Sequence, residues 1–231
     1  MSAIPPIGAD KMFCTVNGVR RSVAWLFANA DTATDVYLDN FPGLASLPNL
    51  NAATHVTLSN LPGITSLPNM DAATVVWLYN LPGITSLPNM DAAINVYLDK
   101  LPGLTRLPNL DAATKVRLEN LPGLTSLPNL DAATHVVLKN LPGLTSLPDM
   151  DSATEVQLEN LLGLTVSYAG KDSRGYQFFV ICIRGEWRII AECRNFSFRE
   201  ARKHWGPGGA SDRRDCLALV EKLIASVQVT A

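Results

Sequence analysis

Long apolar runs are missing from this chain of 231 residues, and none approaches the length of a membrane-spanning helix. The first residues, MSAIPPIGADKMF, also lack the charged stretch and apolar core that mark a secretory signal. These two absences argue against membrane insertion and against signal-dependent secretion. We therefore expect a cytoplasmic or virion-associated protein, unless it is exported by a route that needs no cleavable signal.

Cysteine is scarce, and the signatures of common enzyme classes are absent. The four cysteines, Cys14, Cys182, Cys193 and Cys216, form no CxxC pair, so we expect buried thiols in a reducing compartment and no metal site. Phosphate-loop, zinc-protease and dinucleotide-binding motifs are not present. Cys193 and His204 lie in one region, but Cys193 ends an apolar segment and no motif places an Asp or Asn beside the pair. The sequence predicts a protein that is not an enzyme and holds no cofactor.

An excess of either charge is also lacking, since 19 Lys and Arg against 21 Asp and Glu give a net charge of −2. The distribution is uneven: residues 1–165 hold 8 basic and 14 acidic residues (net −6), and residues 166–231 hold 11 and 7 (net +4). This shift indicates a separate C-terminal unit with a mildly basic, solvated face. No aromatic platform accompanies its basic residues beyond Trp205, so nucleic acid is disfavoured as a partner.

A 20-residue unit is repeated in the sequence from Asp31 to Leu164. Its first copy is DTATDVYLDNFPGLASLPNL, and the seventh, DSATEVQLENLLGLT, is partial. Self-similarity at a fixed period is typical of a stacked solenoid, in which each unit buries its apolar face against its neighbours. We predict an N-terminal cap (1–30), the repeats (31–165) and a C-terminal cap or small α+β domain (166–231). Because a solenoid exposes one long regular surface, we expect it to bind a ligand there.

Two apolar periods alternate within each unit. The segment x-Val-x-Leu-x, as at Val56 and Leu58, has period two, which predicts a short strand with one buried face. Beyond it, apolar residues recur at every third position, and Pro62, Gly63 and Pro68 exclude a continuous α-helix. We expect parallel strands about 4.8 Å apart. Extended polyproline-like backbone with a turn or 3₁₀ corner would join them.

The stretch from Ala53 to Ile64, A-x-x-V-x-L-x-x-L-x-x-I, resembles the LxxLxLxx segment of leucine-rich repeats. The LPNL tetrads at 47–50 and 127–130 are similar to those of the short 20-residue repeats of bacterial proteins, including secreted effectors. The resemblance implies an α/β-type leucine-rich-repeat solenoid with a parallel sheet on its concave face and an irregular or 3₁₀ convex side. A β-helix is the alternative, which the Leu spacing disfavours.

The sequence departs from the leucine-rich-repeat pattern at one position. Asn follows the strand directly, as at Asn40 and Asn60, rather than two places later, and Lys100 replaces it in the fourth unit. The family's carbonyl-bonding Asn ladder is therefore not predicted here. We expect this Asn to occupy a tight turn instead.

The repeats differ from one another almost only at the three x positions of x-Val-x-Leu-x, whose side chains must point away from the core. In leucine-rich repeats that face is the concave wall and commonly carries the ligand site. Exposed aromatic residues rimmed by charge are typical of binding hot spots, although a lack of constraint would also make these positions vary. The ligand-binding residues predicted on this face are Tyr37, Asp39, Trp77, Tyr79, Tyr97, Asp99, Lys115, Arg117, Glu119 and Lys139.

Both ends of the chain carry segments that differ from the repeat. At the N-terminus, Asn17-Gly18 between two short apolar segments predicts a β-hairpin cap. The following RSVAWLFANA, residues 21–30, aligns with FPGLASLPNL as a degraded repeat, in which Ala24, Phe27 and Ala30 take the Leu places.

The C-terminal segment predicts a ββαα unit. Its two strands are expected over residues 176–183 and 186–193. Ser197 with Glu200 three residues later forms a capping box that begins a short helix, and a last helix is expected from Ser211.

These patterns favour a non-catalytic module that binds a protein partner on the exposed face of the sheet. The alternative is a structural or surface-recognition protein, for example a phage or cell-surface component, that binds glycans through the aromatic residues. An enzyme whose activity resides in the C-terminal unit is a third hypothesis. The sequence does not indicate the oligomeric state.

Overall fold

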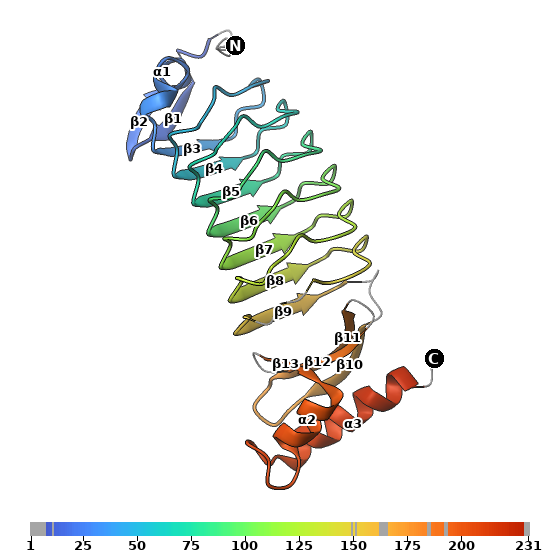
Figure 1. Ribbon diagram of the computed structural model, residues 1–231. Coiled ribbons are helices and arrows are strands. Elements are labelled where there is room, and N and C mark those ends of the chain that lie inside the picture. Colours follow the sequence, from blue (N-terminus) through green and yellow to red (C-terminus); the bar gives the residue numbers. More distant parts are fainter. Residues whose placement is uncertain are drawn as a thin grey trace.

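The computed structural model describes residues 8–10, 12–148, 150, 152–161, 166–183, 186–191 and 194–228. These residues form one sheet of nine strands and one of four. Figure 1 shows the larger sheet as a ladder that runs from the N-terminal hairpin to the smaller sheet, with two helices beyond it. Within these ranges no helix is long and apolar enough to cross a membrane.

Seven parallel strands, one per repeat, form the body of the larger sheet. Each strand pairs with the next at an offset of one repeat, so that Val56 lies opposite Val76 and Leu58 opposite Leu78. Equivalent residues of successive repeats therefore lie in columns across the sheet, and the prediction of a parallel-strand solenoid is confirmed. The strands are β3 (Asp35–Asp39), β4 (His55–Ser59), β5 (Val75–Tyr79), β6 (Asn95–Asp99), β7 (Lys115–Glu119), β8 (His135–Lys139) and β9 (Glu155–Glu159).

The core of the solenoid is formed by the apolar residues of the strand, at period two, and of the return path, at period three. The Val and Leu columns of β3 to β8 are buried, and the return path contributes residues such as Leu61, Ile64 and Met70, which have no exposed surface. Turns and extended backbone join the strands, and the described residues between β3 and β9 include neither an α-helix nor a 3₁₀-helix. The return path is thus the extended form expected from its Pro and Gly residues, without a 3₁₀ corner.

The residue after each strand occupies the tight turn predicted for it. The φ angles of the Asn residues at this position lie between 52° and 62°, and that of Lys100 is 57°. Asn is enriched in this left-handed region, because its short polar side chain can hydrogen-bond locally. The backbone N–H of this residue still donates across the stack, as Asn60 N does to Tyr79 O at 3.0 Å.

An antiparallel hairpin closes the N-terminal edge of the sheet, as the Asn-Gly dipeptide predicts. Its strands β1 (Phe13–Val16) and β2 (Val19–Ser22) are joined by Asn17 and Gly18. The φ angles of these two residues, 51° and 72°, are those of a type I′ turn. β1 also pairs antiparallel with β3, so the hairpin covers the first parallel strand.

The segment after the hairpin is helical, so the prediction of a degraded repeat over residues 21–30 is wrong. Helix α1 (Val23–Asn29) begins after Ser22, whose hydroxyl accepts a hydrogen bond from the Trp25 backbone N–H at 3.1 Å. The 3₁₀-helix η1 (Ala30–Thr32) then leads into β3. This segment has a cap and lacks the Pro and Gly that break helices in the later units. The residues aligned with the Leu positions are only partly buried: Ala24, Phe27 and Ala30.

The smaller sheet is antiparallel, with its four strands in chain order. Two of them correspond to the predicted strands, whereas the first and last were not predicted, so the unit is ββββαα rather than ββαα. Residues 184–185 and Cys193 lie outside the described residues. The strands are β10 (Val166–Lys171), β11 (Gln177–Ile183), β12 (Glu186–Ala191) and β13 (Arg194–Ser197).

Two helices follow the smaller sheet. Helix α2 (Phe198–Trp205) begins with the predicted capping box: Ser197 Oγ accepts from Glu200 N at 3.2 Å, and the Glu200 carboxylate accepts from Ser197 N at 2.7 Å. Helix α3 (Arg214–Gln228) begins slightly later than its predicted start at Ser211.

The smaller sheet is apolar on both faces. Phe178 and Val180 of β11 pack in one cluster with Trp205 of α2 and with α3, whereas Ile181 and Ile190 belong to the core of the solenoid. Successive residues of a strand point to opposite faces, which explains why consecutive residues of β11, from Phe178 to Ile181, are apolar. The C-terminal unit thereby covers the core that the last repeat would otherwise expose to water.

Candidate binding surface

Three outward-facing side chains on neighbouring strands form a continuous stack. In-register pairing places Trp77 of β5 beside Tyr97 of β6, and Tyr97 beside Arg117 of β7. The Trp77 and Tyr97 ring centroids are 5.5 Å apart, and Arg117 Cζ lies 5.3 Å from the centre of the Tyr97 ring. Trp77 remains 52% exposed. A large apolar surface is therefore held in a fixed position and left open to solvent.

A surface groove of about 380 Å³ lies along this stack. Its aromatic wall is Trp77 and Tyr97, and its charged or titratable lining consists of Lys115, Arg117 and His135. The central outward residue of β8, Val137, also lines the groove and is much smaller than Trp77 and Tyr97. We call this feature the aromatic–basic groove.

The cations of the aromatic–basic groove differ in how they are paired. Arg117 binds Glu119 on its own strand, with Nε donating to Oε1 at 2.7 Å. The Lys115 side chain is exposed and, within the described ranges, has no hydrogen bond or ion pair. The pKa of Tyr97 lies above its ordinary value, first through burial and then through the negative charges of Asp99 and Glu119. Tyr97 therefore keeps its proton at neutral pH. Because its side chain has no partner among the described residues, Lys115 is the cation available to a ligand.

Of the ten predicted binding residues, four line the groove: Trp77, Tyr97, Lys115 and Arg117. Glu119 lies next to them through its ion pair with Arg117. Tyr37 is 46% exposed but lies two strands from Trp77, with Thr57 between them. His135 also lines the groove but is not among the ten predicted binding residues. His135 lies opposite Lys115 in the same column of outward-facing residues, and this position could have indicated from the sequence that it lines the groove.

The remaining predicted residues are engaged in contacts within the protein. Asp99 is 5% exposed, and its Oδ1 accepts a hydrogen bond from Asn120 Nδ2 at 2.7 Å. The Lys100 ammonium donates to the Tyr79 hydroxyl at 2.6 Å. Lys139 pairs with a glutamate of the next strand, Glu159, at 3.2 Å.

Asp39 is held in the same manner. Hydrogen bonds from Ser59 Oγ at 2.6 Å and Asn60 Nδ2 at 2.8 Å lower the pKa of its carboxyl. These contacts stabilise the edge of the sheet where the strands end, so we assign Asp39, Asp99, Tyr79 and Lys139 to the scaffold.

Side-chain amides form a ladder along the same edge, which the sequence did not predict. Asn80 Nδ2 donates to Asn60 Oδ1 at 2.8 Å, and the same bond joins Asn120, Asn140 and Asn160 in succession. The ladder is interrupted at the fourth unit, where Lys100 replaces Asn. The hydrogen bonds of this ladder join one side chain to the next. The left-handed turn orients each amide toward its neighbour.

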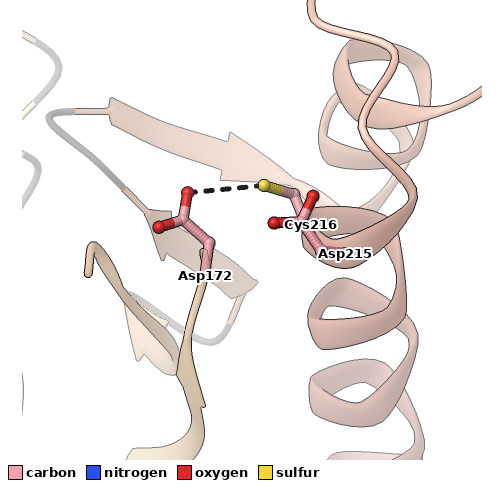
Figure 2. A group of neighbouring side chains, drawn as sticks. All are labelled: Asp172, Asp215 and Cys216. Carbon is pink, nitrogen blue, oxygen red and sulfur yellow. Dashed lines mark hydrogen bonds between the residues drawn. The ribbon is translucent and has the colours of Figure 1, made fainter. Parts of the chain in front are cut away.

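Asp172, Asp215 and Cys216 form a second cluster of polar side chains, in the C-terminal unit (Figure 2). One potential ligand atom from each lies within 4.8 Å of the others. However, the carboxylates are already paired with cations: Arg174 binds Asp172 at 2.8 Å, and Arg213 binds Asp215 at 2.8 Å. Two guanidinium groups at this position disfavour a metal ion.

This cluster connects the turn after β10 to the first turn of α3. The Asp172 side chain is fully buried, and its Oδ1 accepts from the backbone N–H groups of Arg174 at 2.9 Å and Tyr176 at 3.0 Å. The Cys216 thiol lies 3.6 Å from Asp172 Oδ2, and burial followed by the negative charge of Asp215 raises its pKa. The thiol therefore stays protonated, and we interpret the cluster as structural.

Comparison with protein-family models, curated proteins and solved structures finds no match for this chain. The aromatic–basic groove is therefore the feature of the molecule from which a function can be inferred.

Proposed function

We propose that this chain is a non-catalytic binding protein, a leucine-rich-repeat-type solenoid that holds a partner protein on the outward face of β5 to β8. The repeats vary almost only at positions on that face, while the buried columns are nearly constant. This is the pattern expected of a constant scaffold that displays a specific surface.

One observation carries the proposal: the Trp77–Tyr97–Arg117 stack beside an open groove. Trp, Tyr and Arg are the residue types most enriched at binding hot spots, because each contributes a large contact area with few rotatable bonds or a planar set of donors. On an open sheet, a half-exposed Trp exposes apolar surface to water. A partner that covers the ring would remove that surface from water.

Affinity capture from a lysate of the source cells tests this proposal. The comparison is wild type, Trp77→Ala/Tyr97→Ala, and Tyr37→Ala as the matched control, because Tyr37 is similarly exposed but lies outside the groove. We expect wild type and Tyr37→Ala to retain the same partner protein and the double variant to lose it, with unchanged circular dichroism.

Retention of the partner by the double variant would exclude the groove as the binding site. Loss of the partner with Tyr37→Ala alone would move the site to the N-terminal strands. The planar, half-exposed Trp77 ring also suits a sugar ring, so a glycan array is the second measurement. Glycan binding that is abolished by Trp77→Ala, without a captured protein, would favour the glycan alternative.

A further inference from the structure

A second surface depression lies between the last strands of the solenoid and the C-terminal unit. It measures about 520 Å³, and its lining includes Glu155 and Gln157 of β9 together with Tyr176 and Gln177 at the start of β11. His135 lines both this depression and the aromatic–basic groove. The two therefore adjoin on one face of the protein, and we call them together the extended groove.

The two ends of the extended groove differ in chemistry. The Trp77 end has an aromatic wall and three side chains that are cationic or can become so, Lys115, Arg117 and His135, and its lining includes no acidic residue. The far end is polar, with Glu155, Gln157 and the 45% exposed Tyr176. Glu155 also lies 3.7 Å from His135 and partly balances its charge when that ring is protonated. Arg117 is paired with Glu119, so the uncompensated positive charge of the groove lies at Lys115.

The size of the extended groove fits a short stretch of extended chain. Its lining runs across the strands from β5 to β9, four strand spacings, or about 19 Å at the usual distance between strands. An extended peptide covers about 3.3 Å per residue, so about six residues would span this distance. A segment of that length would contact both the solenoid and the C-terminal unit.

We propose that the extended groove binds an extended acidic segment of the partner protein. An apolar or aromatic side chain of the segment packs on Trp77 and Tyr97, and a neighbouring carboxylate pairs with Lys115. The segment then continues over β8 and β9 toward Tyr176, so that the C-terminal unit forms one end of the binding site as well as covering the core. This inference rests on the proposed function and specifies the partner's chemistry.

A random twelve-residue peptide library displayed on phage is the probe for this proposal. It is selected on wild type, on Lys115→Glu, and on Arg106→Glu, which makes the same charge change at an exposed residue of the return path. We expect peptides from wild type and Arg106→Glu to be enriched in Asp or Glu near an aromatic or large apolar residue. Selection on Lys115→Glu should lose the acidic enrichment.

The most enriched peptide is then synthesised, and its dissociation constant is measured by fluorescence anisotropy. We expect Lys115→Glu to weaken binding by about tenfold or more and added salt to weaken binding to wild type, because exposed charges are screened. Tyr176→Ala should weaken binding by about threefold to tenfold. Phe13→Ala, at an aromatic residue of similar exposure in the N-terminal hairpin, should leave it unchanged.

Three outcomes would overturn the inference: selected peptides without acidic enrichment, no enrichment at all on wild type, or equal affinity for wild type and Lys115→Glu. Equal affinity for wild type and Tyr176→Ala would overturn the part assigned to the C-terminal unit. These outcomes can be distinguished from an outcome that would reject the proposed binding function itself. A captured partner that depends on Trp77 and Tyr97 but is indifferent to Lys115→Glu would retain the binding function and reject the acidic segment.

Discussion

The side-chain oxygen of Asn17 accepts two hydrogen bonds from Thr34, one from its backbone N–H at 2.9 Å and one from its hydroxyl at 3.1 Å. The same oxygen accepts a third from the Asp35 backbone N–H at 3.0 Å. One repeat later, the backbone oxygen of Thr34 accepts the equivalent three bonds from Thr54 N, Thr54 Oγ1 and His55 N. The Asn17 side chain therefore takes the place of a carbonyl from a preceding repeat, and the hairpin caps the stack by reproducing its hydrogen bonds.

We expect Asn17→Gly to loosen the N-terminal end of the solenoid, because glycine keeps the left-handed turn but removes the acceptor. Since the freed donors are near water, the expected loss is about 1–2 kcal/mol. Asn17→Asp retains an acceptor oxygen and should lose less. Hydrogen exchange followed by mass spectrometry should show faster exchange at Thr34 and Asp35 in Asn17→Gly. Equal effects of the two substitutions would contradict the role assigned to the side-chain oxygen.

Among the described glycines of the repeats, Gly83 is the one at which an added Cβ would lie closest to the preceding repeat. A Cβ at this position would lie 2.5 Å from the backbone oxygen of Ile64 in the preceding repeat, whereas a Cβ at Gly43 of the first repeat would have no atom within 4 Å. We expect Gly83→Ala to lower the free energy of unfolding by about 1–3 kcal/mol, because backbone must shift to admit the methyl group. Gly43→Ala is the matched control and should be neutral or slightly stabilising. Urea denaturation compares them, and equal effects would show that the close approach is not what requires glycine.

The solenoid could be predicted from the sequence because its contacts repeat at one fixed offset. A strand with period two, such as β7, and Pro and Gly residues in the return path specify both the parallel sheet and its register. The same register predicts that Trp77, Tyr97 and Arg117 lie together on one face of the sheet. These elements depend on local pattern and repetition, which a single sequence contains.

The elements that were missed depend on other information. Helix α1 is not predicted because its residues align with the repeat unit, and its cap at Ser22 is a weaker signal than that alignment. Strands β10 and β13 are the edge strands of the smaller sheet, and each is defined by pairing with a partner rather than by a pattern of its own. Asp99 is buried and accepts a hydrogen bond from Asn120 of the next repeat. This contact between repeats is not visible in the strand pattern, which indicates only that Asp99 points outward.

Asp172 should make the stability of the C-terminal unit depend on pH. Its burial raises the pKa of the carboxyl, but hydrogen bonds from the backbone of Tyr176 and Arg174 and the charge of Arg174 outweigh this, and the pKa lies below its ordinary value. A carboxyl with a lowered pKa stabilises the folded state above the unfolded pKa of about 3.9, and this contribution is lost as the pH falls through the folded-state pKa. We expect Asp172→Asn to lower stability by about 1–3 kcal/mol at pH 7, because the buried carboxylate is the anion with which the partly exposed Arg174 pairs. Thermal melts should show this difference shrinking below about pH 4.

Glu221→Gln, which removes the exposed partner of Arg202, is the control and should change stability by less than about 1 kcal/mol. A difference for Asp172→Asn that stays constant from pH 7 to pH 3 would mean that the loss comes from packing and hydrogen-bond geometry rather than from the charge of the carboxylate.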